Sequence, residues 1–317
     1  MLRAAPVTIC RMNGRARRRR PAWQWRILFA MLAALVPDDA AGRAGDDLVG
    51  KITYHRIQED ETLLEIARLH DLGYVELLAA NPGIDPWLPK PDRTLLLPTA
   101  HLLPTAQREG IVINLPEFRL YYFADGPGRV DTYPIGIGRE GWSTPTGTTA
   151  ITRKREAPTW VPPASIREVR PDLPAAVPPG PDNPLGDYAL SLGWAGYVIH
   201  GTNKPYGIGR RVSSGCIRLY PEDIQALFES VAAGLRVTVV DQPLKVGWSD
   251  GQLYIEVHPD TDQADQLEKT GRFAPAPIPG HVELITEAAG DQADRIAWPV
   301  VERAIETRRG IPIRVTQ

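Results

Sequence analysis

Residues 197–219 read YVIHGTNKPYGIGRRVSSGCIRL, and this stretch decides both the fold and the chemistry that we predict for the chain. It begins as a short apolar strand that ends at His200, and a loop rich in glycine and serine then leads to Cys216. A thiol becomes a strong nucleophile when a nearby histidine takes its proton and holds the resulting ion pair. The stretch therefore predicts Cys216 as a nucleophile and His200 as its general base and acid.

The N-terminus reads as an export signal. Arginines gather in residues 15–20, an apolar run follows at 25–36, and small residues continue to position 44. This order is typical of a secretory signal peptide, which we predict over residues 1–44. The apolar run is short for a membrane span, so an uncleaved anchor is the alternative. Cys10 lies inside the signal, and Cys216 would then be the lone cysteine of an exported protein, without an intrachain partner.

Composition excludes several classes of protein. The chain has 317 residues, 43% hydrophobic and 23% charged, which is typical of a globular protein of more than one domain. The net charge is −2, so nucleic acid is not expected as a partner. The 31 prolines mark linkers and structured loops rather than helices.

Residues 53–99 predict a small domain with the order strand, helix, helix, strand. Apolar residues at helical spacing follow Thr62, and Asn81-Pro82-Gly83 gives a strong stop and turn signal. Residues 95–97 form the closing strand. We predict a linker over residues 100–109.

Residues 110–242 predict a larger domain that is mostly β with some α. Short strands with period two recur along it, and one clear helix begins at Pro221. We expect a sandwich or barrel-like sheet with this one main helix. Residues 243–317 form an extension, with a hairpin around Ser249-Asp250-Gly251 and helices after Asp260 and Ala293.

Several strings together resemble one family. His200-Gly201-Thr202-Asn203 and the segment 213–219 are accompanied by YPIGIG at 133–138, TPTG at 144–147 and PTW at 158–160. This set resembles the YkuD-type L,D-transpeptidases of the ErfK/YbiS/YcfS/YnhG branch, which are periplasmic. Residues 53–99 resemble a LysM module, which binds cell-wall glycan. The alternative is that this module only orients the next domain.

The resemblance implies a mechanism. Cys216 would attack the bond between diaminopimelate and D-Ala in a peptidoglycan tetrapeptide stem, and His200 would protonate the departing D-Ala. The backbone carbonyl of Gly201 would orient the imidazole. The backbone amides of Gly215 and Cys216 are placed to form an oxyanion hole.

Further residues are candidates for binding. The fixed donor fork of Arg218 suits a substrate carboxylate. Many relatives have histidine where this chain has Ser214, which leaves His200 as the only candidate base. The residues predicted to bind substrate are Arg218, Ser214, Asn203 and Trp160, and those predicted to bind glycan are Thr62, Asn81 and Pro82.

The resemblance also implies the partners. No metal or cofactor is expected, and the other histidines show no ligand spacing. The acceptor would be an amine, either on a second diaminopimelate in a 3–3 crosslink or on a lysine of an outer-membrane lipoprotein. Water as acceptor would give an L,D-carboxypeptidase. Carbapenems would acylate the same thiol. The competing hypotheses are a non-catalytic wall-binding protein and a thiol redox protein, and the latter lacks a Cys-x-x-Cys pair.

Overall fold

The computed structural model describes residues 46–124 and 129–317. The predicted signal peptide, residues 1–44, lies outside the described residues, and so does Cys10. Among the helices of the described part, none is both long enough and apolar enough to cross a membrane.

The small N-terminal module has the predicted order of elements. Strand β2 (Thr53–Arg56) pairs antiparallel with β3 (Thr94–Leu97), and helices α1 (Leu63–Leu69) and α2 (Tyr74–Ala80) lie between them in sequence. The two helices contact each other, and their inner faces are buried. The Thr62 side chain caps the first turn of α1.

A second strand pair flanks this module. Strand β1 (Leu48–Gly50) pairs antiparallel with β4 (Ala100–Leu102). The segment predicted as a linker over residues 100–109 therefore begins as a strand, and all three residues of β4 are buried. A linker would leave them in water, so the boundary drawn at residue 100 does not describe this part of the chain.

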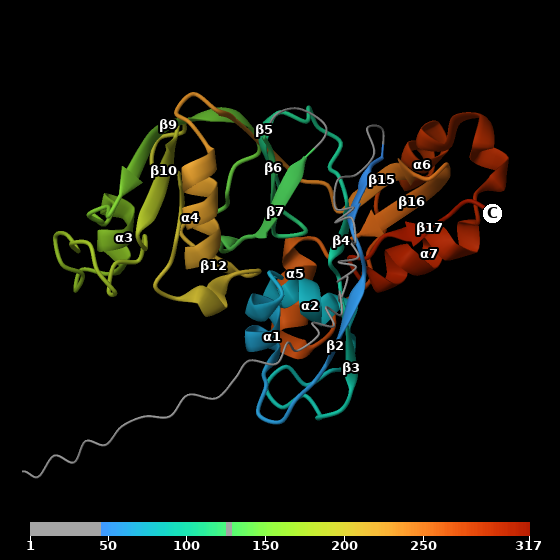
Figure 1. Ribbon diagram of the computed structural model, residues 1–317, viewed down its shortest axis with the longest axis horizontal. Coiled ribbons are helices and arrows are strands. Elements are labelled where there is room, and N and C mark those ends of the chain that lie inside the picture. Colours follow the sequence, from blue (N-terminus) through green and yellow to red (C-terminus); the bar gives the residue numbers. More distant parts are fainter. Residues whose placement is uncertain (1–45, 125–128) are drawn as a thin grey trace, which may run out of the picture. The chain divides into compact units, whose positions relative to one another are not determined.

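The larger domain is built on one eight-stranded sheet, in the spatial order β13-β11-β10-β9-β14-β5-β6-β7. Figure 1 shows β5, β6 and β7 of this sheet side by side, and β9 beside β10. Neighbouring strands are antiparallel, except that β14 is parallel to β5 and β11 is parallel to β13. The strands are β5 (Gly110–Asn114), β6 (Arg119–Phe123), β7 (Val130–Pro134), β9 (Gly147–Glu156), β10 (Tyr188–Leu192), β11 (Val198–His200), β13 (Ile217–Arg218) and β14 (Arg236–Val240). The predicted β-rich domain is confirmed.

The two edges of this sheet meet at one bridge. Gly136 follows the edge strand β7, and its backbone exchanges hydrogen bonds of 2.8 and 2.9 Å with Arg218 on the opposite edge strand β13. A separate pair of short strands, β8 (Ile137–Gly138) and β12 (Arg211–Ser213), continues from this point. The predicted sandwich or barrel-like architecture is thus a single curled sheet with its edges joined near residue 218.

One main helix packs on the sheet, as predicted. Helix α4 (Pro221–Ser230) contacts β10 and buries Ile224 and Leu227 (Figure 1). The proline-rich segment before β10, predicted as a loop, also contains a short helix, α3 (Ala164–Val169). Helix α3 buries none of its residues. No apolar stripe marks such a helix in the sequence.

The C-terminal extension has its own core. Strands β15 and β16 form the predicted hairpin, and a short third strand joins its edge. Helix α5 has Asp260 as its N-cap, as predicted, whereas Ala293 lies in a 3₁₀ turn before the last helix. The elements are β15 (Leu244–Ser249), β16 (Gln252–Val257), α5 (Thr261–Thr270), α6 (His281–Ala289), η2 (Gly290–Arg295), α7 (Trp298–Thr307) and β17 (Ile313–Arg314).

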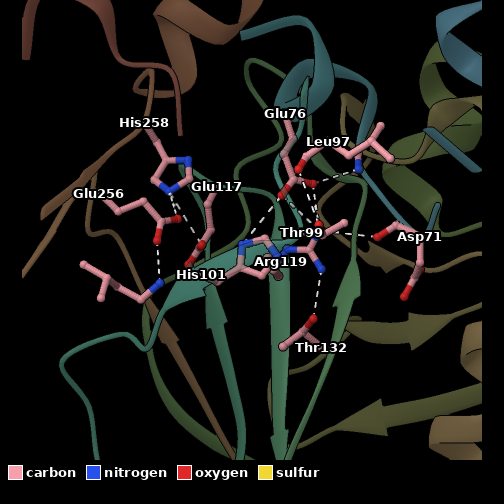
Figure 2. Close-up of polar contacts among 12 residues, drawn as sticks. Asp71, Glu76, Leu97, Thr99, His101, Glu117, Arg119, Thr132, Glu256 and His258 are labelled. Atoms are coloured by element: carbon pink, nitrogen blue, oxygen red, sulfur yellow. Dashed lines mark hydrogen bonds and ion pairs between the residues drawn. The ribbon is translucent and has the colours of Figure 1, made fainter. Parts of the chain in front are cut away.

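A buried polar cluster joins the extension to the large sheet and to the segment around β4; we call it the junction cluster (Figure 2). Lys245 is fully buried, and its Nζ lies 2.5 Å from Glu117 Oε2 and 3.0 Å from Glu256 Oε1. His258 Nε2 lies 2.7 Å from the same Glu256 oxygen. Beside them, Arg119 forms a buried ion pair of 2.7 Å with Glu76 of α2.

The junction cluster also contains donors that a metal ion can use. Atoms of His101, Glu117 and Glu256 lie within 4.8 Å of one another. The ammonium of Lys245 already supplies a cation to both carboxylates. The chemistry of this donor set therefore fits an internal ion pair rather than a metal site.

Candidate active site

Two neighbouring strands bring the predicted nucleophile and base together. His200 is the last residue of β11, and Cys216 comes directly before β13. The two strands are parallel, with His200 in register with Arg218. Cys216 and His200 consequently line one cleft of about 450 Å³, a size in the range of small-ligand sites.

The turn before the nucleophile is held by two hydroxyl groups. Gly215 has a φ of +99°, a backbone conformation that favours glycine. The Ser213 hydroxyl accepts from the Gly215 amide at 3.1 Å and donates to the Cys216 carbonyl at 2.6 Å. The Thr144 hydroxyl donates to the Gly215 carbonyl at 2.9 Å. Sequence reasoning did not identify Ser213 and Thr144 as site residues, although both lie in the strings that carried the resemblance.

These contacts bear on the predicted oxyanion hole. The amide of Gly215 donates to Ser213 at 3.1 Å, so it would have to exchange this partner for an oxyanion. The backbone amides of Gly215 and Cys216 both stay predicted donors.

The imidazole of His200 has a defined tautomer. Its Nδ1 lies 2.5 Å from the carbonyl oxygen of Gly201, which can only accept, so Nδ1 carries the proton. This is the contact predicted for Gly201. Burial, and next the positive charge of Arg218, lowers the pKa of His200 to about 3. The resting imidazole is therefore neutral, with Nε2 unprotonated and available as a base.

The thiol is also neutral at rest. Burial raises the pKa of Cys216, although a backbone hydrogen bond at Val198 and the charge of Arg218 oppose the increase. Its Sγ lies 3.7 Å from the carbonyl oxygen of Gly196. The preformed thiolate–imidazolium pair that we expected from the sequence is thus disfavoured. A neutral thiol and a neutral imidazole are instead the starting forms for general-base catalysis, in which the proton moves during the attack.

The structure separates the four predicted substrate-binding residues. Arg218, Ser214 and Trp160 line the cleft with Cys216. Asn203 does not line it, because its side-chain amide donates to the carbonyl of Asp182 at 3.1 Å, beside a different hollow. The prediction that Asn203 contacts the substrate is therefore not supported by its position.

The cleft contains cations without matching acids. The described residues that line the cleft include Arg155 and Arg218 but no aspartate or glutamate. The Nε atoms of both arginines are buried, and no described group accepts a hydrogen bond from either. Burial lowers the pKa of Arg218. Both arginines are half-buried, and a half-buried guanidinium without an acidic partner suits an anionic ligand. Sequence reasoning missed Arg155.

The loop that carries Cys216 is tied to the C-terminal extension. Arg210 forms an ion pair with Glu268 of α5, and Arg211 lies 2.9 Å from Asp265 of the same helix. These arginines are thus neutralised by the extension and do not face the thiol as free charges. Helix α5 of the extension thereby holds the loop that leads to Cys216 through these ion pairs.

The predicted glycan-binding residues have local structural contacts. Thr62 caps α1, and the Asn81 side chain bonds to backbone atoms of Leu77 and Leu96 at 2.8 to 2.9 Å. Pro82 lines a separate hollow beside α7. These contacts hold the module together. Glycan binding by the three residues stays a prediction.

Comparisons with known proteins identify the family of the chain. Residues 108–239 match the YkuD family, described as the L,D-transpeptidase catalytic domain. The chain is 40% identical over 282 residues to the probable L,D-transpeptidase YcfS of Escherichia coli strain K12, covering 86% of each chain. It is 41% identical over 279 residues to the probable L,D-transpeptidase YbiS of the same strain, covering 86% of this chain and 89% of the relative. The NMR structure of the catalytic domain from E. faecium L,D-transpeptidase matches with 24% identity and a TM-score of 0.34, over 43% of this chain and 100% of that one.

The sequence relatives settle the class of the protein. They are similar over most of their length, and the match spans both the β-rich domain and the segments around it. The chain belongs to the L,D-transpeptidase family and is an enzyme of that class. The resemblance predicted from the sequence strings is confirmed for the catalytic domain.

Proposed function

We propose that this enzyme uses the tetrapeptide stem of peptidoglycan as its acyl donor. One observation carries the proposal: Cys216 and His200 share a cleft that holds unpaired arginines and no acidic side chain among its described lining. A stem peptide is rich in carboxylates, so it supplies the missing negative charge. It also presents an amide for the thiol to attack.

These residues support the following steps of acyl transfer from the donor to an amine. Nε2 of His200 takes the thiol proton while Sγ of Cys216 bonds to the carbonyl carbon at the L-centre of diaminopimelate. The amide of Cys216 donates to the developing oxyanion. His200 then returns the proton to the departing nitrogen, D-Ala leaves, and a thioester remains. An amine acceptor attacks the thioester, loses a proton to His200 and releases the thiol.

Arg218 couples donor binding to the strength of the base. Its charge lowers the pKa of His200 in the free enzyme. A donor carboxylate bound to Arg218 neutralises this charge, so the pKa of His200 rises toward its ordinary value. The imidazole therefore becomes a better base when the donor is present, which limits thiolate formation, and hence thiol oxidation, in the empty enzyme.

The acceptor distinguishes the candidate activities. An amine of a second stem gives a 3–3 crosslink, a lysine of an outer-membrane lipoprotein gives protein attachment, and water gives an L,D-carboxypeptidase. We favour an amine, because the family is named for transfer and not for hydrolysis. A carbapenem is expected to acylate Cys216, because its strained amide reacts with the same thiol. We place the activity in the periplasm, where the stems lie.

The test uses the purified full chain with tetrapeptide muropeptides and mass spectrometry. We expect release of D-Ala, a thioester on Cys216 and products joined through an amine. The Cys216→Ala variant should fold and give none of these. A folded enzyme that leaves every tetrapeptide intact and forms no adduct with a carbapenem would refute the proposal. Release of D-Ala without a joined product would establish the carboxypeptidase instead.

A separate experiment addresses the acceptor and the location. Muropeptides from a deletion strain should lose either dipeptide-linked crosslinks or lipoprotein remnants. Cell fractionation should place the protein with periplasmic markers. Recovery in the cytoplasmic fraction would contradict the proposed location.

A further inference from the structure

The active-site residues form one row across four strands of the large sheet. Arg155 of β9 lies opposite Ala189 of β10, and Ala189 lies opposite His200 of β11. His200 in turn pairs with Arg218 of β13. Residues in register on neighbouring strands project from the same face of a sheet. The row therefore places an arginine on each side of the catalytic histidine.

The adjacent row of residues identifies the face of the sheet that is covered by helix α4. Lys154, Leu190, Ile199 and Ile217 are in register on the same four strands and project from the opposite face. The three apolar residues belong to the core that also contains α4. Nζ of Lys154 donates to the carbonyl of Val231 at the end of α4, at 2.7 Å. The helix thus covers one face of the sheet, and the cleft occupies the other.

Arg155 is held in the cleft without an acidic partner. It lines the same cleft as Cys216 and Arg218. Its Nε is buried and finds no acceptor among the described residues, and its contact with Ser191 is long, at 3.5 Å from Nη2 to Oγ. Folding alone does not explain a guanidinium in this position, whereas an anionic ligand does.

The spacing along the row separates the two cations. Neighbouring strands lie about 4.8 Å apart, so the backbone of Arg218 is one strand from His200, and that of Arg155 is two strands away on the other side. Between them, Ala189 is buried and small. It does not line the cleft, whereas Arg155, His200 and Arg218 do. The two guanidiniums can therefore bind two separate anionic groups of one extended ligand.

We propose that Arg155 is a second carboxylate anchor of the donor site, which binds the part of the donor retained in the thioester. The inference extends the proposed function, because it assumes a tetrapeptide stem as donor. The released D-Ala has a single carboxylate, only two bonds from the scissile nitrogen, and Arg218 is close enough to the catalytic pair to hold it. The retained part has carboxylates on D-Glu and on the D-centre of diaminopimelate, farther from the scissile bond. Arg155 holds one of these two.

The experiment combines enzyme variants with amidated donors. Three synthetic tetrapeptides are compared: the unmodified stem, the stem amidated on D-Glu and the stem amidated on the D-centre of diaminopimelate. We expect Arg155→Gln to lower kcat/KM for thioester formation with the unmodified stem by about 10- to 100-fold, as for loss of a charged hydrogen-bond partner. One amidation should lower the wild-type value by a similar factor and leave the value of Arg155→Gln unchanged.

Arg153→Gln is the matched control. Arg153 lies two residues earlier on the same strand, is exposed and borders a neighbouring hollow with Arg155, but it does not line the cleft. This change therefore removes a like charge close to Arg155 and leaves the lining of the cleft intact. Its rates and those of the wild type should agree for every donor. Thermal unfolding monitored by circular dichroism checks that each variant is folded.

The outcomes separate the two proposals. If the wild type acylates the stems but Arg155→Gln loses the same factor with all three donors, or loses nothing, Arg155 is not a carboxylate anchor and the proposed function stands. If the folded wild type acylates none of the donors, the proposed function fails and this inference fails with it. Loss of discrimination toward one amidated donor, confined to Arg155→Gln, supports the anchor.

Discussion

Two regions of the molecule contain charged side chains that are buried or half-buried. One region pairs its cations with carboxylates, and the other does not. In the junction cluster, Lys245 contacts Glu117 and Glu256. Arg119 contacts Glu76 in the same cluster (Figure 2). Every cation there has a carboxylate within hydrogen-bond distance. In the cleft, Arg155 and Arg218 have none among the described residues.

The contrast separates groups that stabilise the fold from groups that bind a ligand. A buried ion pair is costly to break, because the remaining partner keeps an uncompensated charge. Removing a half-buried cation that has no ion-pair partner breaks no such pair, so it costs the fold little. Substitutions in the buried ion pairs should therefore lower stability. Substitutions of the unpaired arginines should lower activity. The predictions below test this division in one region or in both.

Two of the buried histidines, His200 and His258, should show the largest difference. His200 Nδ1 contacts the backbone carbonyl of Gly201, whereas His258 contacts the carboxylate of Glu256 in the junction cluster. We expect His200→Gln to lower the rate of thioester formation by at least about 10⁴-fold, as in other enzymes that lose their general base. His258→Gln should retain most activity and lose about 1–3 kcal/mol of stability.

Single-turnover acylation and urea denaturation measure the two effects. If His258→Gln, while folded, lost activity as severely as His200→Gln, the division between the two regions would be wrong.

The second prediction concerns the cation of the junction cluster. Lys245→Met leaves the carboxylates of Glu117 and Glu256 buried without their shared cation. The free energy of unfolding should fall by about 3–5 kcal/mol. Urea denaturation at neutral pH measures the loss. A triple variant that also carries Glu117→Gln and Glu256→Gln removes the stranded charges and should recover part of it. Equal stability of Lys245→Met and the wild type would contradict the assignment.

Much of the fold was predictable from sequence because strands and one helix leave local patterns. Period-two alternation indicated the strands of the large sheet, and Pro221 with acidic residues after it indicated the start of α4. Helix α6 was missed, since Val282 and Leu284 are exposed while Ile285 is buried, so its apolar residues form no single stripe. Strand β4 was missed because it is stabilised by pairing with β1, far away in sequence.

The site was predictable only in part, for a related reason. Cys216 and His200 follow from their chemistry and their place in recognisable strings. Arg155 lies in Thr152-Arg153-Lys154-Arg155-Glu156, a run with no apolar alternation to say which side chains face inward. Its face depends on pairing with β10, and the register of that pairing shifts at residues 191 and 192. The engagement of the Gly215 amide by Ser213 likewise depends on a side-chain position that no local pattern specifies.

The third prediction compares two arginines. Arg218→Gln should lower kcat/KM for thioester formation by about 10- to 100-fold, because the donor loses a charged partner. Its free energy of unfolding should stay within about 1 kcal/mol of the wild type, because no ion pair is broken. Arg119→Gln leaves Glu76 buried without its partner, so it should cost about 3–5 kcal/mol. Similar stability losses in both variants would contradict the distinction between the junction cluster and the cleft.

The last effect is a pH dependence of stability that arises in the cleft and is small near neutral pH. His200 has a pKa of about 3 in the folded protein, against an ordinary value of 6.5. Between these values the unfolded chain binds a proton at this residue and the folded protein does not. Stability from this residue is therefore complete above pH 6.5 and is lost as the pH falls toward 3, by up to about 1.4 kcal/mol per pH unit.

Urea denaturation of the wild type and of His200→Gln at several pH values isolates this contribution, because the other titrating groups are common to both. As the pH falls below 6.5, the free energy of unfolding should fall more steeply in the wild type than in His200→Gln. The two slopes should differ by about 1.4 kcal/mol per pH unit, the value for one bound proton. Arg218→Gln should narrow the pH window, because loss of the neighbouring charge raises the folded-state pKa of His200. Parallel curves for wild type and His200→Gln would mean that the buried imidazole is protonated as readily in the folded protein as in the unfolded chain. The neutral base required by the mechanism would then be absent.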